Sequence, residues 1–405
     1  MKISEIKPKV YTLAAEAEKQ IEPQFKLIDE VCQKNTYKVI QAFQDNKVSE
    51  SCFAGTTGYG YDDLGRDTLD KLYAQVFGTE SALVRLNFVN GTHAIKTALF
   101  SMVKPGDAIL SLTGMPYDTL RKAIGIGSTE FGSLKYYGID FIEGSFEDLN
   151  NKTVKAVILQ RSCGYSDRPA LSIDKIGEIC QRVRELRDDV YIFCDNCYGE
   201  FTEIKEPTDV GVDIIAGSLI KNPGGGIAPT GAYIAGKQEL IERAAYILTS
   251  PGIGAECGST LGNNRLLYQG VFFAPHTVAQ ALKTAVFASK ITELVGIESD
   301  PAFDAKRSDI IQRLKLGDKD RMIRFCEGIQ SGAPVDSFVK PVPWPMPGYD
   351  CDVIMADGSF IQGSSIELSA DGPMKEPYNL YLQGGLTYES GKLGIMMAVS
   401  SLLDD

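Results

Sequence analysis

Apolar residues recur along the chain in two alternating patterns. Short runs rich in Val and Ile, such as VKAVILQ (154–160) and DVYIFCD (189–195), have the length and composition of buried strands. Between most of these runs lie segments with apolar residues at helical spacing, such as IDKIGEICQRVRELR (173–187). Strands that alternate with helices of this length predict an α/β fold in which βαβ units surround a mostly parallel, buried sheet.

The pattern divides the chain into three parts. Apolar positions at helical spacing, with many charges between them, predict an N-terminal helical arm over residues 1–55. A large domain over 56–285 contains further expected helices, RDTLDKLYAQVFG and GTHAIKTALFSMV, and expected strands, SALVRLNFV, DAILSL, DIIAGSLI and GAYIAG. From residue 286 to 405 we expect a smaller α+β domain, with a first helix AVFASKITELVGIE and strands CDVIMA, SSIELSA and LGIMMAVSS.

Composition narrows the possible partners and the compartment. The 405 residues carry a net charge of −12, which repels nucleic-acid backbones and anionic membranes, so we expect neither as a partner. The nine cysteines are scattered and odd in number, and the first residues lack the apolar run of a secretory signal, which favours a reduced, cytoplasmic protein. Cys194 and Cys197 have the spacing of a metal or redox pair, but no second pair completes a ligand set, so we expect no metal.

Candidate functional residues follow the predicted strands at the points where the strands end. In an open parallel sheet, ligands bind outside the carboxyl ends of the strands. The first such position is Asn90-Gly91-Thr92, directly before a helix whose free N–H groups and dipole suit a phosphate, with His93 as a further possible contact. The other strand ends carry an aromatic ring, a carboxylate, a hydroxyl and an amine, namely Tyr117, Asp195, Ser218 and Lys221.

This set of groups matches the needs of one cofactor. We expect desolvation to lower the pKa of Lys221, and a lysine that is partly neutral condenses with an aldehyde as a Schiff base. Pyridoxal 5'-phosphate (PLP) carries that aldehyde and requires an anion cradle, a stacking ring and an acid beside its pyridine nitrogen. The sequence therefore predicts a PLP site.

The same residues resemble a known family. The order of NGTHAIKTAL, PYDTL, DNCYGEF and GSLIK is similar to the cystathionine β-lyase and methionine γ-lyase branch of fold-type-I PLP enzymes. GYGYDDLGRDTLDKLYAQVFG and YLQGGLTYESGKLGI resemble the bacterial aluminium-resistance subfamily of that branch. The resemblance covers the chain from about residue 55 to its end, and it implies the aspartate-aminotransferase-like architecture of a large PLP-binding domain and a smaller C-terminal domain.

The resemblance also implies residue roles. Lys221 would hold the cofactor and move protons, Asp195 would pair with the pyridine nitrogen, and Tyr117 would stack on the ring. Gly91, Thr92 and Ser218 would hold the phosphate, with Asn90 beside them.

In that family a tyrosine and an arginine reach the phosphate of the neighbouring subunit, which implies a homodimer or homotetramer with active sites at the subunit interface. Tyr61 matches the tyrosine and is, with Tyr117, a candidate for assisting proton transfer. Asp63 stands where the arginine belongs, and Arg66 is the nearest alternative.

Recognition of the substrate departs from the family pattern. The related lyases bind the substrate carboxylate through an arginine of the C-terminal domain, and no arginine follows Arg324 in this chain. Arg161 is our first candidate for this role, because it lies at another strand end, and Arg168 and Lys392 are alternatives.

We expect a PLP-dependent carbon–sulfur lyase that removes the α-proton of a cystathionine- or methionine-like amino acid and eliminates a thiol at Cβ or Cγ. The alternatives are transamination or racemisation on the same cofactor, and a cofactor-binding stress or metal-resistance protein without turnover.

Overall fold

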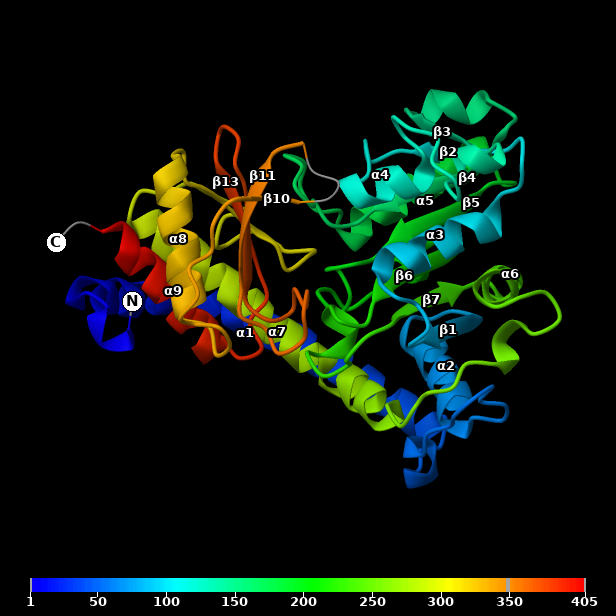
Figure 1. Cartoon of the computed structure of the whole chain (residues 1–405), viewed down its shortest axis with the longest axis horizontal. Coiled ribbons are helices and arrows are strands. Elements are labelled where there is room, and N and C mark those ends of the chain that lie inside the picture. Colours follow the sequence, from blue (N-terminus) through cyan, green and yellow to red (C-terminus); the bar gives the residue numbers. More distant parts are fainter. Residues whose placement is uncertain (1, 347–349, 404–405) are drawn as a thin grey trace.

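The computed structural model describes residues 2–346 and 350–403 and shows two domains joined by long helices (Figure 1). The helices are α1 Pro8–Asp45, α2 Leu64–Val76, α3 Gly91–Met102, α4 Asp118–Ile124, α5 Ile173–Leu186, α6 Gln238–Leu248, α7 Asn264–Leu294, α8 Lys319–Ser331 and α9 Tyr388–Leu402. The strands are β1 Ser81–Arg85, β2 Ala108–Ser111, β3 Asp140–Glu143, β4 Val154–Gln160, β5 Tyr191–Asp195, β6 Ile214–Ser218, β7 Ala232–Gly236, β8 Ser299–Asp300, β9 Gln312–Lys315, β10 Trp344–Pro345, β11 Asp352–Asp357, β12 Ser369–Pro373 and β13 Asn379–Gln383.

The large domain is built on a seven-stranded sheet in the order β1-β7-β6-β5-β4-β2-β3. Only β7 runs antiparallel to its neighbours, so the carboxyl ends of the other six strands lie along one edge. All five residues of β6 and all five of β7 are buried, which explains why these runs are almost continuously apolar. The predicted α/β fold with a mostly parallel sheet is confirmed.

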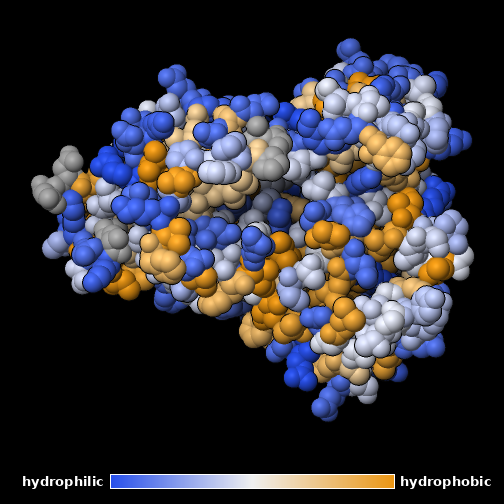
Figure 2. Space-filling view, viewed as in Figure 1, coloured by the Kyte–Doolittle hydropathy of each residue, from blue (hydrophilic) through white to orange (hydrophobic). Residues whose placement is uncertain are grey.

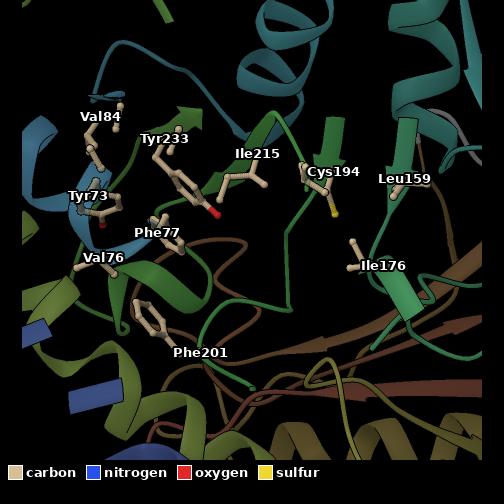
Figure 3. Packing of buried hydrophobic residues seen from close by; sticks show 14 of the residues in the cluster. Tyr73, Val76, Phe77, Val84, Leu159, Ile176, Cys194, Phe201, Ile215 and Tyr233 are labelled. Atoms are coloured by element: carbon tan, nitrogen blue, oxygen red, sulfur yellow. The ribbon is translucent and has the colours of Figure 1, made fainter. Parts of the chain in front are cut away.

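Helices cover both faces of this sheet and enclose two apolar cores. One core gathers residues of α2, α5 and α7, and the other gathers residues of α3, α4 and α6. Figure 3 shows part of the first core, where Tyr73, Phe77, Phe201 and Tyr233 lie close together. Phe77 stacks on Tyr233 with ring centroids 4.9 Å apart, a contact worth about 0.5–1.5 kcal/mol beyond the area that it buries. These layers hold the strand ends in fixed positions.

The small domain has a six-stranded antiparallel sheet in the order β10-β11-β12-β13-β9-β8, covered by α8 and α9. Its core also contains Val10, Ala14 and Ile21 of α1. In Figure 1, α1 and α7 run side by side beneath both domains, and an ion pair between Lys283 and Asp29 joins them. The N-terminal arm is therefore a long helix that packs against α7 and connects the two domains.

Three details differ from the sequence prediction. LGIMMAVSS, predicted as a strand, lies within α9, which begins after the N-cap Thr387 and packs against α8 and α7. Its apolar residues are buried on most sides, and such a run lacks the polar face that distinguishes helix from strand. Of SSIELSA, only Ser369 and Ala370 belong to β12. The predicted boundary between residues 285 and 286 falls inside α7, which continues from one domain into the other.

The surface carries both charged and apolar areas. No helix within residues 2–346 and 350–403 has the length and hydropathy needed to cross a bilayer. In Figure 2, polar colours cover much of both domains, and the surface is hollowed where the domains meet. Apolar colours gather over the diagonal of α1 and α7, where Phe272 and Phe273 are about two-fifths exposed.

Two helical glycines offer a matched test of the packing around the turn that follows Lys221. A Cβ at Gly270 of α7 would lie 2.6 Å from the carbonyl oxygen of Gly224, in the turn that follows Lys221. We expect Gly270→Ala to destabilise the protein by about 1–3 kcal/mol, because backbone must move to admit the methyl group. Chemical denaturation measures the change in the free energy of unfolding.

Gly177→Ala on α5 is the control. Its Cβ would meet Val210 at 3.4 Å, an ordinary contact, so the better helix propensity of alanine should stabilise by up to about 1 kcal/mol. Equal changes in the free energy of unfolding for the two variants would contradict the close contact between α7 and the turn Asn222–Gly224 that follows Lys221.

Candidate active site

The strand ends of the large domain bring the predicted groups to one edge of the sheet. Asp195 and Ser218 end the neighbouring strands β5 and β6, and Lys221 follows three residues after Ser218. A Cβ at Gly91 would lie 3.2 Å from the Cβ of Ser218 and 3.9 Å from the sulfur of Cys197. The first turn of α3 therefore lies directly beside the ends of β5 and β6.

The predicted anion cradle lies at the N-terminus of α3. The side chain of Asn90 caps the helix by accepting a hydrogen bond from the N–H of His93 at 2.8 Å. Asn90 is therefore a helix cap, and Gly91 and Thr92 keep the helix-terminal N–H groups that an anion can use. His93 packs edge-on against Phe88, and its Nδ1 accepts the N–H of Val89 at 3.4 Å.

Tyr117 lies next to this cradle. Its hydroxyl is 3.1 Å from the hydroxyl of Thr92. Burial raises the pKa of Tyr117, and the nearby Asp195 and Cys197 raise it further. The phenol thus stays protonated at neutral pH and can donate a hydrogen bond within the site.

Asp195 is a buried carboxylate with few partners. Only 4% of the residue is exposed, and its Oδ1 accepts the N–H of Cys197 at 3.1 Å. Burial raises the pKa of Asp195, and the charge of Lys221 counteracts part of that effect. A buried acid beside an amine suits a ligand that carries a basic nitrogen.

Lys221 is partly buried, and its amine lies 3.9 Å from the centre of the Tyr198 ring. The expectation that its pKa is lowered is wrong for this arrangement of side chains. Burial does act downward, but acidic neighbours outweigh it and raise the pKa of Lys221 well above its ordinary value; these are Cys197, Tyr198 and Asp195. The sequence showed the burial of the lysine but not the groups that surround it.

Tyr198 is a site residue that the sequence reasoning missed. Its backbone has φ +70°, which is strained for a tyrosine, and its hydroxyl lies 3.2 Å from that of Ser365 in the small domain. The sequence does carry a signal for this residue, because Tyr198 follows Asp195 by three residues, just after the end of a predicted strand.

Tyr61 and Arg66 lie on the loop and helix that precede the cradle, and no described contact joins them to Lys221 or Asp195. The ring of Tyr61 is 57% exposed and stacks on Tyr59 with centroids 5.5 Å apart. Arg66 is buried, and its guanidinium donates to the carbonyl of Gly60 at 2.6 Å and pairs with Asp67 at 2.9 Å. Arg66 therefore fixes the loop that presents Tyr61 to the surface.

Arg161, the first candidate for binding the substrate carboxylate, is committed elsewhere. Its side chain is fully buried and donates to Asn196 at 2.8 Å and to Glu206 at 3.2 Å. Glu203 accepts a further bond at 3.4 Å. This geometry contradicts the expectation of substrate binding, because the positive charge neutralises acids of the protein itself.

The two alternatives to Arg161 lie in different surroundings. Lys392 forms an ion pair with Glu18 of α1 at 2.7 Å. Arg168 donates only to main-chain carbonyls, those of Gln160 at 2.7 Å, Ser162 at 2.6 Å and Pro169 at 3.1 Å. Among the described residues, Arg168 therefore pairs with no carboxylate.

The two cysteines of CDNC face different parts of the protein. Cys194 packs into the core beneath α5, near Leu159 and Ile176 in Figure 3. Cys197 packs on the opposite side of the sheet, beside Gly91. Across residues 2–346 and 350–403, no three His, Cys, Asp or Glu side chains gather in a way that suits a metal.

The residues present fit PLP. A Cβ at Gly91 would lie only 3.2 Å from the Cβ of Ser218, so the glycine lets the N-terminus of α3 approach the end of β6 closely enough for groups from both to bind one phosphate. Asp195 and Lys221 lie within electrostatic reach of each other and of Tyr117. A helix N-terminus, a buried acid, a tyrosine ring and an amine thus share one site.

Known proteins share this sequence and fold. The family model described as methionine gamma-lyase matches residues 10–403. The uncharacterized protein YnbB of Bacillus subtilis is 48% identical over 402 residues, which cover 96% of each chain. The crystal structure of a carbon-sulfur lyase involved in aluminum resistance from Clostridium novyi is 51% identical with a TM-score of 0.95, covering 98% of this chain and 97% of that one.

A more distant structure shares the fold alone. It is the pyridoxal-5'-phosphate dependent protein YhfS of Escherichia coli, with 16% identity and a TM-score of 0.63 over 93% of this chain and 97% of that chain. The fold is thus one used by PLP-dependent proteins. Because the family model matches nearly the whole chain, this protein belongs to the methionine gamma-lyase family.

The structural role of Arg161 is open to a stability test. We expect Arg161→Ala to lower the free energy of unfolding by about 3–5 kcal/mol, because it leaves the fully buried carboxylate of Glu206 without its cation. Arg182→Ala is the control, since Arg182 forms an exposed pair with Glu185 and should change stability by less than about 1 kcal/mol. A stable Arg161→Ala protein with a raised KM would restore the substrate-binding role.

Proposed function

We propose that the protein is a PLP-dependent carbon–sulfur lyase that acts on a sulfur-containing amino acid by removing the α-proton and eliminating a thiol at Cβ or Cγ. The observation that carries the proposal is that the charges of Lys221 and the buried Asp195 interact at the sheet edge where the helix terminus at Gly91 lies against Ser218. The carbon-sulfur lyase activity named for the Clostridium novyi relative supports the reaction class.

The chain's residues divide into those that would hold the cofactor and those that would act on the substrate. Gly91, Thr92 and Ser218 would bind the phosphate, with Asn90 holding the helix terminus, and Tyr117 would stack on the ring. When bound, PLP supplies an electron sink that stabilises negative charge at the α-carbon of the substrate.

Lys221 would move the proton. Asp195 would pair with the ring nitrogen of the cofactor rather than with the lysine. The charge of Asp195 would then no longer raise the pKa of the amine, so burial, which lowers the pKa of Lys221, would be opposed by fewer neighbours. Nζ of Lys221 could therefore take the α-proton as a general base. The hydroxyl of Tyr117 lies 3.1 Å from that of Thr92. It would assist the elimination by donating a proton.

Arg168 is the group that we propose for the substrate carboxylate. Its guanidinium has no acidic partner among the described residues, and it lies near enough to Asp195 for their charges to interact. Because these carbonyls are neutral, the positive charge of the Arg168 guanidinium stays available to an anion, which it can bind through two parallel hydrogen bonds.

The proposal also covers the oligomeric state of the protein and the cellular compartment in which it works. We propose a homodimer, or a tetramer of two dimers, in which the exposed Tyr61 contributes to the phosphate site of the neighbouring subunit. Arg66 would hold the loop of Tyr61 in position for that contact. All nine cysteines are free thiols, which suits a protein that works in the reducing cytoplasm.

The products distinguish elimination from the other reactions of the cofactor. Incubation of the PLP-loaded protein with cystathionine, methionine and S-alkyl cysteines should release a thiol, ammonia and a keto acid in equal amounts. A requirement for an amino acceptor would instead indicate transamination, and loss of optical rotation without thiol would indicate racemisation. Cofactor binding with no turnover of any sulfur amino acid would support a binding protein.

Substitution of Lys221 tests the central residue. We expect Lys221→Ala to reduce turnover by at least about 100-fold, because the variant lacks the general base. Borohydride should fix PLP to the wild-type chain at residue 221, as read by peptide mass, and should leave Lys221→Ala unlabelled.

Two further variants serve as comparisons. Lys205→Ala, at an exposed position, should keep both the label and the activity. Asp195→Ala should keep the label and lose turnover. A labelled and active Lys221→Ala protein would refute the assignment.

A further inference from the structure

A second buried carboxylate lies on the small domain where that domain meets the large one. Asp371 lies on β12 and is 6% exposed. One of its oxygens, Oδ2, accepts hydrogen bonds from the hydroxyl of Tyr165 and from the side-chain amide of Gln383, each at 2.9 Å. Tyr165 belongs to the loop that follows β4 of the large domain, so Asp371 lies where the two domains meet.

The surroundings of Asp371 hold it in place. The ring of Tyr165 packs on Tyr381 with centroids 4.7 Å apart, and the hydroxyl of Tyr381 donates to the carbonyl of Tyr165 at 2.9 Å. Tyr381 stands opposite Asp371 in the pairing of β12 with β13. The loop of the large domain and the sheet of the small domain thus form one rigid cradle around this carboxylate.

The other oxygen of Asp371 has no partner. Oδ1 is buried and accepts no hydrogen bond from the described residues. A buried acceptor without a donor destabilises a fold, and more so when it is charged, so a fold that keeps one needs a reason for it. A ligand that supplies the missing donor is one such reason.

The charge of Asp371 also interacts with that of Lys221. Burial raises its pKa to about 6, and the charge of Lys221 lowers that value in part, which places the two groups within electrostatic reach. At neutral pH the side chain is therefore mainly a carboxylate, which accepts hydrogen bonds and repels anions. It is unsuited to the α-carboxylate of an amino acid and well suited to an ammonium group.

We propose that Asp371 is a specificity-determining residue that binds a second amino group, at the far end of the substrate's side chain. This assignment rests on the proposed lyase function, and it adds the class of substrate. The preferred substrates are thioether amino acids whose departing portion ends in an amine rather than in a methyl group. Gln383 and Tyr165 act through Asp371 by orienting its carboxylate.

A pair of substrates of equal size tests the assignment. S-(2-aminoethyl)cysteine and S-propylcysteine differ only in a terminal ammonium or methyl group, and the homocysteine thioethers with the same two ends serve if cleavage is at Cγ. With the PLP-loaded wild-type protein, kcat/KM should be about 10- to 100-fold higher for the aminoethyl compound, as expected for one hydrogen bond to a charged group.

The ratio of the two kcat/KM values should fall to about 1–3 in Asp371→Asn, because an amide keeps the shape and loses the charge. Asp352→Asn is the matched control, since Asp352 lies exposed on the neighbouring strand β11 and should keep the wild-type ratio. Lys221→Ala provides a readout without turnover. In the Lys221→Ala protein, calorimetry should give a lower dissociation constant for the aminoethyl compound than for the propyl compound. The double variant Lys221→Ala, Asp371→Asn should bind the two compounds equally.

Equal rates for the two compounds in the wild-type protein would overturn the assignment while leaving the lyase proposal intact. The same holds if the Asp371→Asn protein keeps the full ratio. Release of no thiol from either pair would overturn the lyase proposal itself and this assignment with it.

Discussion

The rest of the site is organised around a buried acid and a partly buried amine, Asp195 and Lys221, whose charges interact at one sheet edge. Removing a carboxylate and an ammonium group from water costs several kcal/mol for each ion, and mutual attraction offsets that cost only when the groups are close. Asp195 has one N–H donor and the charge of Lys221, and Lys221 has the face of Tyr198. Parallel strands make this pairing possible, because β5 and β6 end at the same edge.

The two domains meet through groups that also touch this site. Tyr198, beneath the lysine, lies within hydrogen-bonding distance of Ser365 of the small domain, and its carbonyl accepts the N–H of Ile310 at 3.2 Å. The loop after β4 reaches the small domain at Asp371. A change in the angle between the domains would therefore move the groups around the lysine, and the continuous helices α1 and α7 oppose such a change.

The arginines show how the same residue type serves different purposes according to its neighbours. Arg161 is surrounded by the acids Glu203 and Glu206 and acts as an internal counter-ion. Arg168, seven residues later, is half-buried and, among the described residues, donates to main-chain carbonyls and to no carboxylate. The two arginines thus differ in whether their charge is neutralised by acids of the protein itself.

The sequence by itself determined the local elements and the chemistry at the strand ends. The apolar runs of β4, β5 and β6 and the helical period of α5 predict the parallel sheet, and Asn90, Asp195 and Lys221 follow at positions that a parallel sheet gathers. The apolar run of α9 was misread because a segment buried on most sides has no polar face to reveal its period. Local pattern also could not show that Glu206, 45 residues along the chain, neutralises Arg161.

Which groups surround each charge became known from the folded chain. The raised pKa of Lys221, the internal role of Arg161 and the unpaired oxygen of Asp371 all depend on residues distant in sequence. Electrostatic interactions act through space and depend on burial, and the spacing of residues along a chain specifies neither.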